Sequence, residues 1–309
     1  MKSRILELFR SASDIVSGET LSAALGISRV SVWKHIQKLQ ECGYQIDSTP
    51  KGYRLIQSPD TPFPWEFPDR ETSMHYFPEV TSTMDIAREM ARKGAPHFTV
   101  VAAGRQTGGR GRLRRTWYSD DGGLYFTLIL RPEIPLQWCS RVNFAASLVL
   151  CRVIREWTGV NAAVKWPNDL LVEGKKLSGM LSEMEAEAEM VSFVTVGIGI
   201  NVHNDPTVNE PGACSLDRLA GKPVSRSALL ARFLDELQSY VNGSDPLMEH
   251  VVLEWKKWTC TLGRHVSVMT PQETSTGVAV DVDPAGALIL EMADGTRKKV
   301  IYGDCMNND

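Results

Sequence analysis

The chain has 309 residues, of which 43% are apolar and 23% are charged, and its formal net charge is −3. This composition is typical of a soluble globular protein of two or three domains, and it excludes a chain that is a nucleic-acid binder throughout. The sequence has no signal-like apolar segment, and no apolar run approaches the roughly 20 residues that cross a bilayer. We therefore expect no membrane binding. Six scattered cysteines without metal-ligand spacing predict reduced thiols and a cytoplasmic protein.

The charge is distributed unevenly along the chain. Residues 1–58 carry eight Lys and Arg against five Asp and Glu, whereas residues 59–309 carry 26 against 32. A basic first segment joined to an acidic remainder predicts that the first segment contacts a polyanion.

Residues 1–58 are predicted to form a winged helix-turn-helix. A first amphipathic helix is interrupted at residues 17–19, Thr20 is expected to cap a short second helix, and Ser28 is expected to cap a third. The predicted apolar positions of the third helix are Val30, Val32, Trp33, Ile36 and Leu39. Two short strands at residues 44–47 and 52–56 follow as a wing. We expect DNA contacts from the polar residues on and before the third helix: Ser28, Arg29, Ser31, Lys34, His35 and Lys38.

Four prolines in residues 59–69 predict an extended linker. Residues 70–262 have the pattern of a mixed α/β domain. Its predicted helices are residues 83–93, opened by a capping box at Ser82, then 143–157, 227–240 and 246–258. Its predicted strands are residues 98–103, 124–130, 162–166, 177–183 and 191–200. Residues 263–309 predict a small β-barrel of about five strands.

Residues 108–117, Gly-Gly-Arg-Gly-Arg-Leu-Arg-Arg-Thr-Trp, combine flexible glycines with four arginines. A loop of this composition between two strands is suited to folding over an anionic ligand, because guanidinium groups bind phosphate and carboxylate. It is neither a Walker A loop nor a dinucleotide fingerprint, since no helix follows the glycines. A solvated basic loop is the alternative interpretation.

Three further segments carry polar groups at strand ends. They are Lys165-Trp166-Pro167-Asn168-Asp169, Lys176-Leu177-Ser178-Gly179 and Gly197-Ile198-Gly199-Ile200-Asn201. Each alone is consistent with an ordinary strand end or turn. Together with the Arg-Gly loop they offer cations and amides for a phosphate-bearing ligand and Mg²⁺.

In their order and spacing these segments resemble those of biotin–protein ligases. With the helix-turn-helix, the chain is similar to the bacterial type that is both ligase and repressor of the biotin operon. The resemblance implies an α+β multidomain protein whose central domain is related to class II aminoacyl-tRNA synthetases, with an SH3-like C-terminal barrel. It also implies ATP, Mg²⁺ and biotin as ligands, and it implies biotin carboxyl carrier protein, operator DNA and a second copy of the adenylate-bound chain as partners.

The same resemblance implies roles for individual residues. Lys176 and Arg112 would act in catalysis, and no residue is assigned to a metal. Biotin would be bound by Ser82, Thr83, Met84, Gln106, Arg110, Gly111, Arg112, Lys176 and Gly179. The nucleotide would be bound by Arg112, Arg115, Trp117, Lys165, Asn168 and Asn201. Two positions depart from the family pattern: Met84 replaces an Asn, and Arg114 replaces the last Gly of the loop, which is expected to stiffen it.

Two other functions are compatible with the sequence. One is a lipoate–protein ligase, which has a related fold and the same adenylate chemistry. The other is a transcription factor that senses a small ligand without turning it over. Release of pyrophosphate with biotin and ATP would distinguish the ligase from the sensor.

Overall fold

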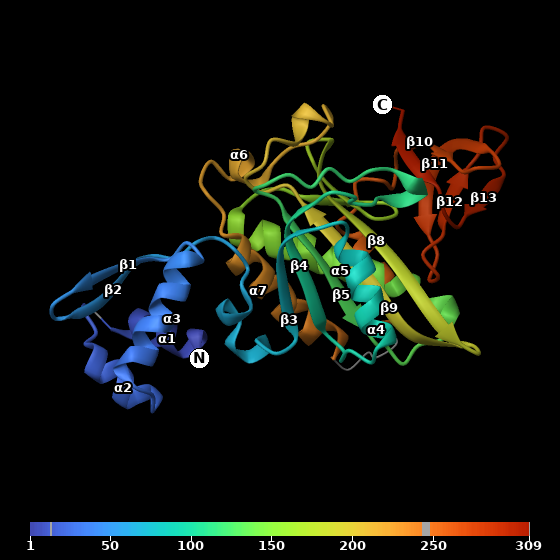
Figure 1. Ribbon diagram of the computed structural model, residues 1–309. Helices are drawn as coiled ribbons and strands as arrows, with labels where there is room; N and C mark the ends of the chain where they lie inside the picture. Colours follow the sequence, from blue (N-terminus) through green and yellow to red (C-terminus); the bar gives the residue numbers. More distant parts are fainter. Residues whose placement is uncertain (13, 243–247, 309) are drawn as a thin grey trace. The chain divides into compact units, whose positions relative to one another are not determined.

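A computed structural model describes residues 1–12, 14–242 and 248–308. The chain separates into two compact units, residues 1–72 and residues 73–309 (Figure 1). Each unit is described by itself below.

The first unit is a winged helix-turn-helix, as predicted. Its helices and strands are α1 (Lys2–Ser11), α2 (Gly18–Leu25), α3 (Arg29–Glu41), β1 (Gln45–Thr49) and β2 (Gly52–Gln57). The strands pair antiparallel and form the wing. Leu6, Leu21 and Leu39 are fully buried between the helices, and this apolar burial is the main stabilising contribution to a unit of this size.

Two details of the helix-turn-helix differ from the prediction. Ser17, not Thr20, caps α2: its Oγ accepts the backbone N–H of Thr20 at 3.0 Å. Ser28 caps α3 as predicted. Val30 and Trp33 were predicted to be core residues, but they are 63% and 48% exposed. At 100° per residue Val30 lies on the side of α3 away from the buried Val32 and Ile36, and Trp33 lies on the flank between that side and Ile36.

The predicted extended linker is wrong. Its residues form two single turns, η1 (Pro64–Glu66) and η2 (Pro68–Arg70), with proline at the first position of each. Phe63 and Trp65 pack against the core of the first unit. Glu66 accepts from Arg10 at 2.8 Å. The aromatic residues between the prolines therefore bury themselves, and the segment belongs to the first unit.

The second unit is built on a seven-stranded mixed sheet with the order β3-β4-β5-β9-β8-β7-β6. Its strands are β3 (Met74–Val80), β4 (Thr99–Gln106), β5 (Leu124–Leu130), β6 (Ala163–Lys165), β7 (Asp169–Val172), β8 (Lys175–Glu187) and β9 (Met190–Ile200). Only β3 and β4 run parallel; the other neighbours in the sheet are antiparallel. β5 is buried along its whole length because helices cover both faces.

The helices of the second unit are α4 (Thr83–Arg92), α5 (Ser140–Thr158), α6 (Leu216–Ala220), α7 (Arg226–Val241) and α8 (Val251–Lys256). On one face, α4 packs over Val101 and Ile129. On the other face, Phe126 of β5 meets Phe233 of α7 with ring centroids 5.6 Å apart. Helix α4 therefore lies on the face opposite α5 and α7 (Figure 1).

The prediction identified most elements of this unit but missed three. β3, α6 and β7 were not predicted, and Asp169, the first residue of β7, was interpreted as a possible turn residue. The predicted helix 246–258 is shorter, since α8 begins at Val251, and residues 246–247 lie outside the described part of the chain.

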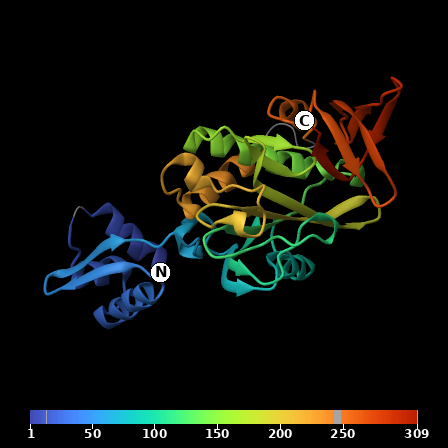
Figure 2. The ribbon, with the colours of Figure 1, turned by 90° about the horizontal axis from the view of Figure 1, so that it is seen from above.

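The C-terminal residues form a five-stranded antiparallel sheet with the order β13-β12-β11-β10-β14 (red in Figure 2). The strands are β10 (His265–Met269), β11 (Thr274–Val282), β12 (Leu288–Glu291), β13 (Arg297–Val300) and β14 (Asp304–Asn307). The buried Trp166 donates its indole N–H to the Gly286 carbonyl at 2.9 Å. Ser140 of α5 donates to Ala285 at 2.7 Å. These bonds attach the C-terminal sheet to α5 and to the segment that follows β6 of the seven-stranded sheet.

No helix in the described part of the chain is long and apolar enough to span a membrane.

All six cysteines are free thiols. This agrees with the prediction from their spacing.

Candidate functional site

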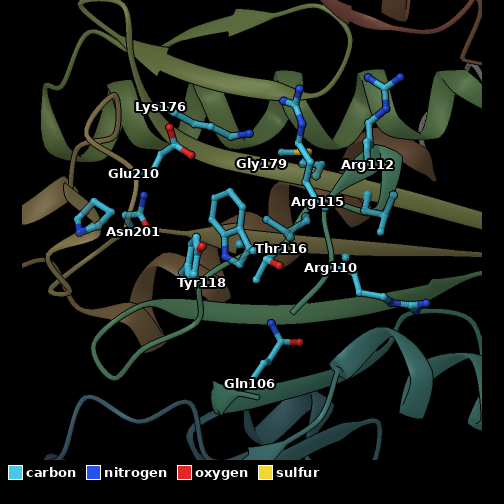
Figure 3. Close-up of a pocket in the computed structure, with 18 of the residues that line it drawn as sticks. Gln106, Arg110, Arg112, Arg115, Thr116, Tyr118, Lys176, Gly179, Asn201 and Glu210 are labelled. Atoms are coloured by element: carbon cyan, nitrogen blue, oxygen red, sulfur yellow. The ribbon is translucent and has the colours of Figure 1, made fainter. Parts of the chain in front are cut away.

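A pocket opens where the loop between β4 and β5 lies over the ends of β8 and β9 (Figure 3). Thirteen of the fourteen residues predicted to bind biotin or nucleotide line it: Ser82, Thr83, Met84, Gln106, Arg110, Gly111, Arg112, Arg115, Trp117, Asn168, Lys176, Gly179 and Asn201. These residues come from segments more than 100 positions apart in the sequence, and the sheet topology brings them together.

Glycines form the floor of the pocket. A Cβ atom at Gly199 would lie 2.3 Å from the indole nitrogen of Trp117, and one at Gly179 would lie 2.9 Å from the Trp117 ring. A Cβ at Gly197 would lie 2.6 Å from Met84 Sδ. A larger residue at these points would displace the Trp117 ring or the Met84 side chain, because real Cβ atoms do not approach this closely. The intervening Ile198 and Ile200 are buried on the opposite face of β9.

The N-terminus of α4 forms one end of the pocket. The predicted capping box at Ser82 is wrong: Ser82 makes no capping hydrogen bond. Instead Gln106 Oε1 accepts from the backbone N–H of Thr83 at 2.8 Å and from its hydroxyl at 3.1 Å. The Ser82 hydroxyl is buried and has no partner among the described residues. A buried hydroxyl without a hydrogen bond destabilises the folded protein, and a ligand in the pocket could supply the missing hydrogen bond.

The Arg-Gly loop, residues 108–117, folds back on itself as a short hairpin. Gly111 N–H donates to the Arg115 carbonyl at 2.7 Å, and Trp117 N–H donates to the Gly109 carbonyl at 2.9 Å. Leu113 and Arg114 adopt left-handed φ values of 52° and 60°. Arg114 thus holds a conformation that glycine adopts at little cost and that costs another residue about 1–2 kcal/mol.

Three arginines of the loop make separate contacts. Arg110 pairs with Asp85 of α4 at 2.9 Å. Arg112 Nη1 donates to Asn168 Oδ1 at 3.2 Å. Arg115 pairs with Asp304 of the C-terminal sheet. Arg112 is half-buried, whereas Arg110 and Arg115 are exposed, and burial lowers the pKa of the Arg112 guanidinium.

Lys176 stands at the start of β8 beside the Trp117 ring, with its Nζ 5.4 Å from the ring centroid. It pairs with Asp169 at 2.9 Å. Asn201 is buried at the end of β9, where its Oδ1 accepts from Asn204 at 3.0 Å. Figure 3 shows Lys176 and Asn201 on the same side of the pocket. A cation and amides at one end and uncharged groups at the other suit a ligand with one anionic and one neutral part.

Lys165 is the fourteenth predicted residue, and it is not among the residues that line this pocket. It lies on β6, the edge strand of the sheet. Its charge is close to the thiol of Cys305, whose pKa burial raises to about 11 while Lys165 opposes that shift.

Several lining residues were not predicted. They include Tyr118, Asp120, Asn204, Asn209, Glu210 and Asp304. Asn204, Asn209 and Glu210 belong to an irregular segment after β9, and Asp304 starts a strand in a different sheet. No local pattern marks such residues, because only the tertiary fold brings them to the pocket.

In the first unit the predicted DNA-binding residues lie on or before α3. Ser28, Arg29, Lys34 and Lys38 are exposed, whereas Ser31 and His35 are half-buried. Burial lowers the pKa of His35, helped by the positive charges of the N-terminus, Lys38 and Lys2. The exposed face of α3 is therefore basic through its lysines and carries the apolar Val30 and Trp33.

Among the described residues, no group of three or more His, Cys, Asp or Glu side chains is arranged to hold a metal ion. The acidic Asp169 is already paired with Lys176. A divalent cation in this pocket would take most of its ligands from phosphate oxygens and water, as Mg²⁺ does with nucleotides.

Comparison with known proteins agrees with this architecture. Residues 76–201 match the biotin/lipoate A/B protein ligase family, residues 2–54 match an HTH domain, and residues 261–306 match the biotin protein ligase C-terminal domain. The bifunctional ligase/repressor BirA of Bacillus subtilis (strain 168) is 35% identical over 317 residues, which cover 96% of each chain. BirA of Escherichia coli (strain K12) is 28% identical and covers 93% of this chain and 91% of its own length.

Among solved structures, the biotin protein ligase from Aquifex aeolicus in complex with biotin and ATP has a TM-score of 0.63 and 27% identity, and it covers 76% of this chain and 98% of its own. The fold and the pocket thus define a ligase of the biotin/lipoate type joined to a helix-turn-helix unit. The match of one third of the residues over nearly the full chain is more specific: the chain belongs to the bifunctional biotin ligase/repressor family.

Proposed function

We propose that the chain activates biotin with ATP to biotinyl-5′-AMP, transfers biotin to a lysine of a biotin carboxyl carrier protein, and represses biotin-synthesis genes with the adenylate as corepressor. The observation that carries this proposal is the pocket itself. Lys176, Arg112 and the amides of Asn168 and Asn201 line it together with the buried hydroxyls of Ser82 and Thr83, so it offers groups for both an anionic and a neutral part of one ligand. The proposed limits of the ligase domain are residues 70 and 262, with the C-terminal domain at 263–309.

In the first step a carboxylate oxygen of biotin attacks the α-phosphorus of ATP, and pyrophosphate leaves with the electron pair of the broken P–O bond. The protein must align two anions and stabilise the charge of the transition state. Lys176 and Arg112 are proposed to do this. Trp117 is proposed to pack against the adenine. Mg²⁺ would enter with ATP as part of the substrate and neutralise phosphate charge.

In the second step the acceptor amine attacks the acyl carbon, the C–O bond to phosphate breaks, and AMP leaves. The adenylate is a mixed anhydride that water destroys, so it must be shielded until the amine arrives. The Arg-Gly loop is proposed to be the shield. The acceptor supplies the nucleophile, which is consistent with cysteine pKa values that burial raises, as at Cys214, to about 11.

The assignment is tested by Lys176→Ala and Arg112→Gly, with pyrophosphate release and adenylate retention measured separately. We expect Lys176→Ala to slow pyrophosphate release by roughly 10²–10³-fold, the cost of losing one preorganised charge stabiliser. Lys175→Ala is the matched control, because Lys175 is the exposed neighbour on the same strand and does not line the pocket. Unchanged release and retention in both test variants would refute the roles.

The repressor function requires the adenylate-bound chain to bind two operator half-sites, so we propose that it then forms a dimer. The exposed lysines of α3 and the family membership support DNA binding. Gel filtration with and without biotin and ATP tests ligand-driven assembly, and an unchanged mass would count against it.

A further inference from the structure

Four charged side chains form a cluster at the outer edge of the pocket. Arg110 Nη2 lies 2.9 Å from Asp85 Oδ1 and 3.6 Å from Glu183 Oε1. Arg88 lies 2.6 Å from the same Asp85 oxygen and 3.1 Å from Glu183 Oε2. Two carboxylates are thus shared by two guanidinium groups. Asp85 and Arg88 belong to α4, Glu183 belongs to β8, and only Arg110 comes from the Arg-Gly loop.

The two carboxylates are fixed by regular structure, whereas Arg110 is on a loop. Asp85 sits in the first turn of α4, next to the pocket residue Met84, and Glu183 of β8 is paired with Thr195 of β9. In Figure 3 Arg110 extends away from Lys176 and Asn201. The contact therefore fastens the N-terminal half of the loop to the wall of the pocket, away from the ligand.

We propose that Asp85 and Glu183 are positioning residues that hold the Arg-Gly loop over the pocket through Arg110, and so set how long the adenylate is retained. This inference rests on the proposed function. It adds two residues that are not among those lining the pocket and that act on the reaction through the loop.

The size of the effect follows from the exposure of the groups. The side chains of Arg110 and Asp85 are 36% and 45% exposed, so solvent screens their attraction. Pairs of this kind change an equilibrium by about two- to fivefold. We therefore expect loss of Asp85 to speed loop opening by about that factor. We also expect added salt to reduce the difference between wild type and variant.

The structure supplies a matched control. Arg92 and Glu185 form a second ion pair that also joins α4 to β8, and it does not involve the loop. Glu185→Gln removes an ion pair between α4 and β8 but leaves the contacts of Arg110 with Asp85 and Glu183 in place. A variant that merely loosened the packing of α4 on the sheet would behave like Glu185→Gln.

The experiment compares Asp85→Asn, Glu183→Gln and Glu185→Gln with the wild type. The first readout is the rate at which trypsin cleaves after the loop arginines, which does not require catalysis. The second is the rate at which preformed biotinyl-5′-AMP leaves the enzyme. We expect Asp85→Asn and Glu183→Gln to raise both rates about two- to fivefold, and Glu185→Gln to leave both at the wild-type value.

Three results would overturn the inference: equal rates in all four proteins, an effect of Glu185→Gln as large as that of Asp85→Asn, or faster cleavage without faster release. A wild type that forms no adenylate would instead refute the proposed function. Trypsin cleavage would still show whether Asp85 and Glu183 hold the loop.

Discussion

At the scale of single residues, the shape of the pocket depends on three glycines, which have no side chains, as well as on the polar residues that line it. Gly199 and Gly179 leave room for the Trp117 indole, and Gly197 leaves room for Met84. Because β9 is paired on both sides, by β5 and β8, its backbone cannot move away from a larger residue. The glycines are therefore a condition for placing Trp117 against the sheet.

Gly199→Ala should displace the Trp117 indole, since the new methyl group would lie 2.3 Å from its nitrogen. If Trp117 packs against adenine, we expect ATP affinity to fall by about tenfold or more, in the range of one lost aromatic contact. Titration calorimetry measures it. Gly212→Ala is the control, because its Cβ would meet nothing closer than 3.9 Å. Equal affinity in Gly199→Ala and wild type would show that Trp117 does not contact the nucleotide.

Ser82→Ala separates a role in ligand binding from a role in folding. The buried Ser82 hydroxyl has no hydrogen-bond partner in the described part of the chain, so its removal should leave the free energy of unfolding unchanged or raise it by up to about 1 kcal/mol. Biotin affinity should fall. Thr99→Val is the matched control: Thr99 Oγ1 is also buried and unpaired, but it is outside the pocket. A loss of biotin affinity in Thr99→Val as large as in Ser82→Ala would contradict the assignment.

At the scale of elements, α3 presents exposed Lys34 and Lys38 one turn apart on the face that carries Val30. If both lysines contact phosphates, each alanine substitution should reduce the slope of log affinity against log salt by about 1. Fluorescence anisotropy with operator DNA measures the slope. Lys93→Ala in the second unit is the control, because Lys93 is paired with Glu89 on α4. Slopes equal to the wild-type value in both α3 variants would place DNA elsewhere.

His35 on the same helix gives the first unit a pH dependence. Its pKa is lowered from 6.5 by burial, then by the N-terminus, Lys38 and Lys2. The unfolded chain therefore binds the proton first as pH falls below 6.5, so stability is complete above that value and decreases below it. The free energy of unfolding changes by at most about 1.4 kcal/mol per pH unit through this one group. Denaturant titrations of wild type and His35→Gln between pH 7 and pH 5 should show a smaller decrease in the variant; parallel curves would contradict the shift.

The sequence predicted helices and strands well where the pattern of apolar residues is regular. β5 matches its predicted bounds, residues 124–130, because an unbroken apolar run needs cover on both faces. The prediction failed where tertiary contacts decide. Phe63 and Trp65 fold the proline segment onto the first unit, and Gln106 replaces Ser82 as the group that satisfies the start of α4. The partners of the loop arginines, Asp85 and Asp304, carry no local signal at all.

At the scale of the whole second unit, the Arg-Gly loop is fastened at both ends to different layers. Arg110 is held by α4 and β8, and Arg115 is held by Asp304 of the C-terminal sheet. That sheet is attached to the catalytic layers through the Trp166 indole. The C-terminal sheet is thus part of the pocket, and the family match of residues 261–306 is consistent with its role in the ligase.

Transfer of label to a carrier domain is the most direct test of the proposed ligase activity. The protein is incubated with labelled biotin, Mg²⁺-ATP and a biotin carboxyl carrier domain, and a parallel reaction contains labelled lipoate. We predict covalent label on one carrier lysine from biotin only, dependent on ATP and accompanied by pyrophosphate release. Label from lipoate instead, or biotin bound without pyrophosphate release, would contradict the central claim that this loop-covered pocket makes and shields biotinyl-5′-AMP.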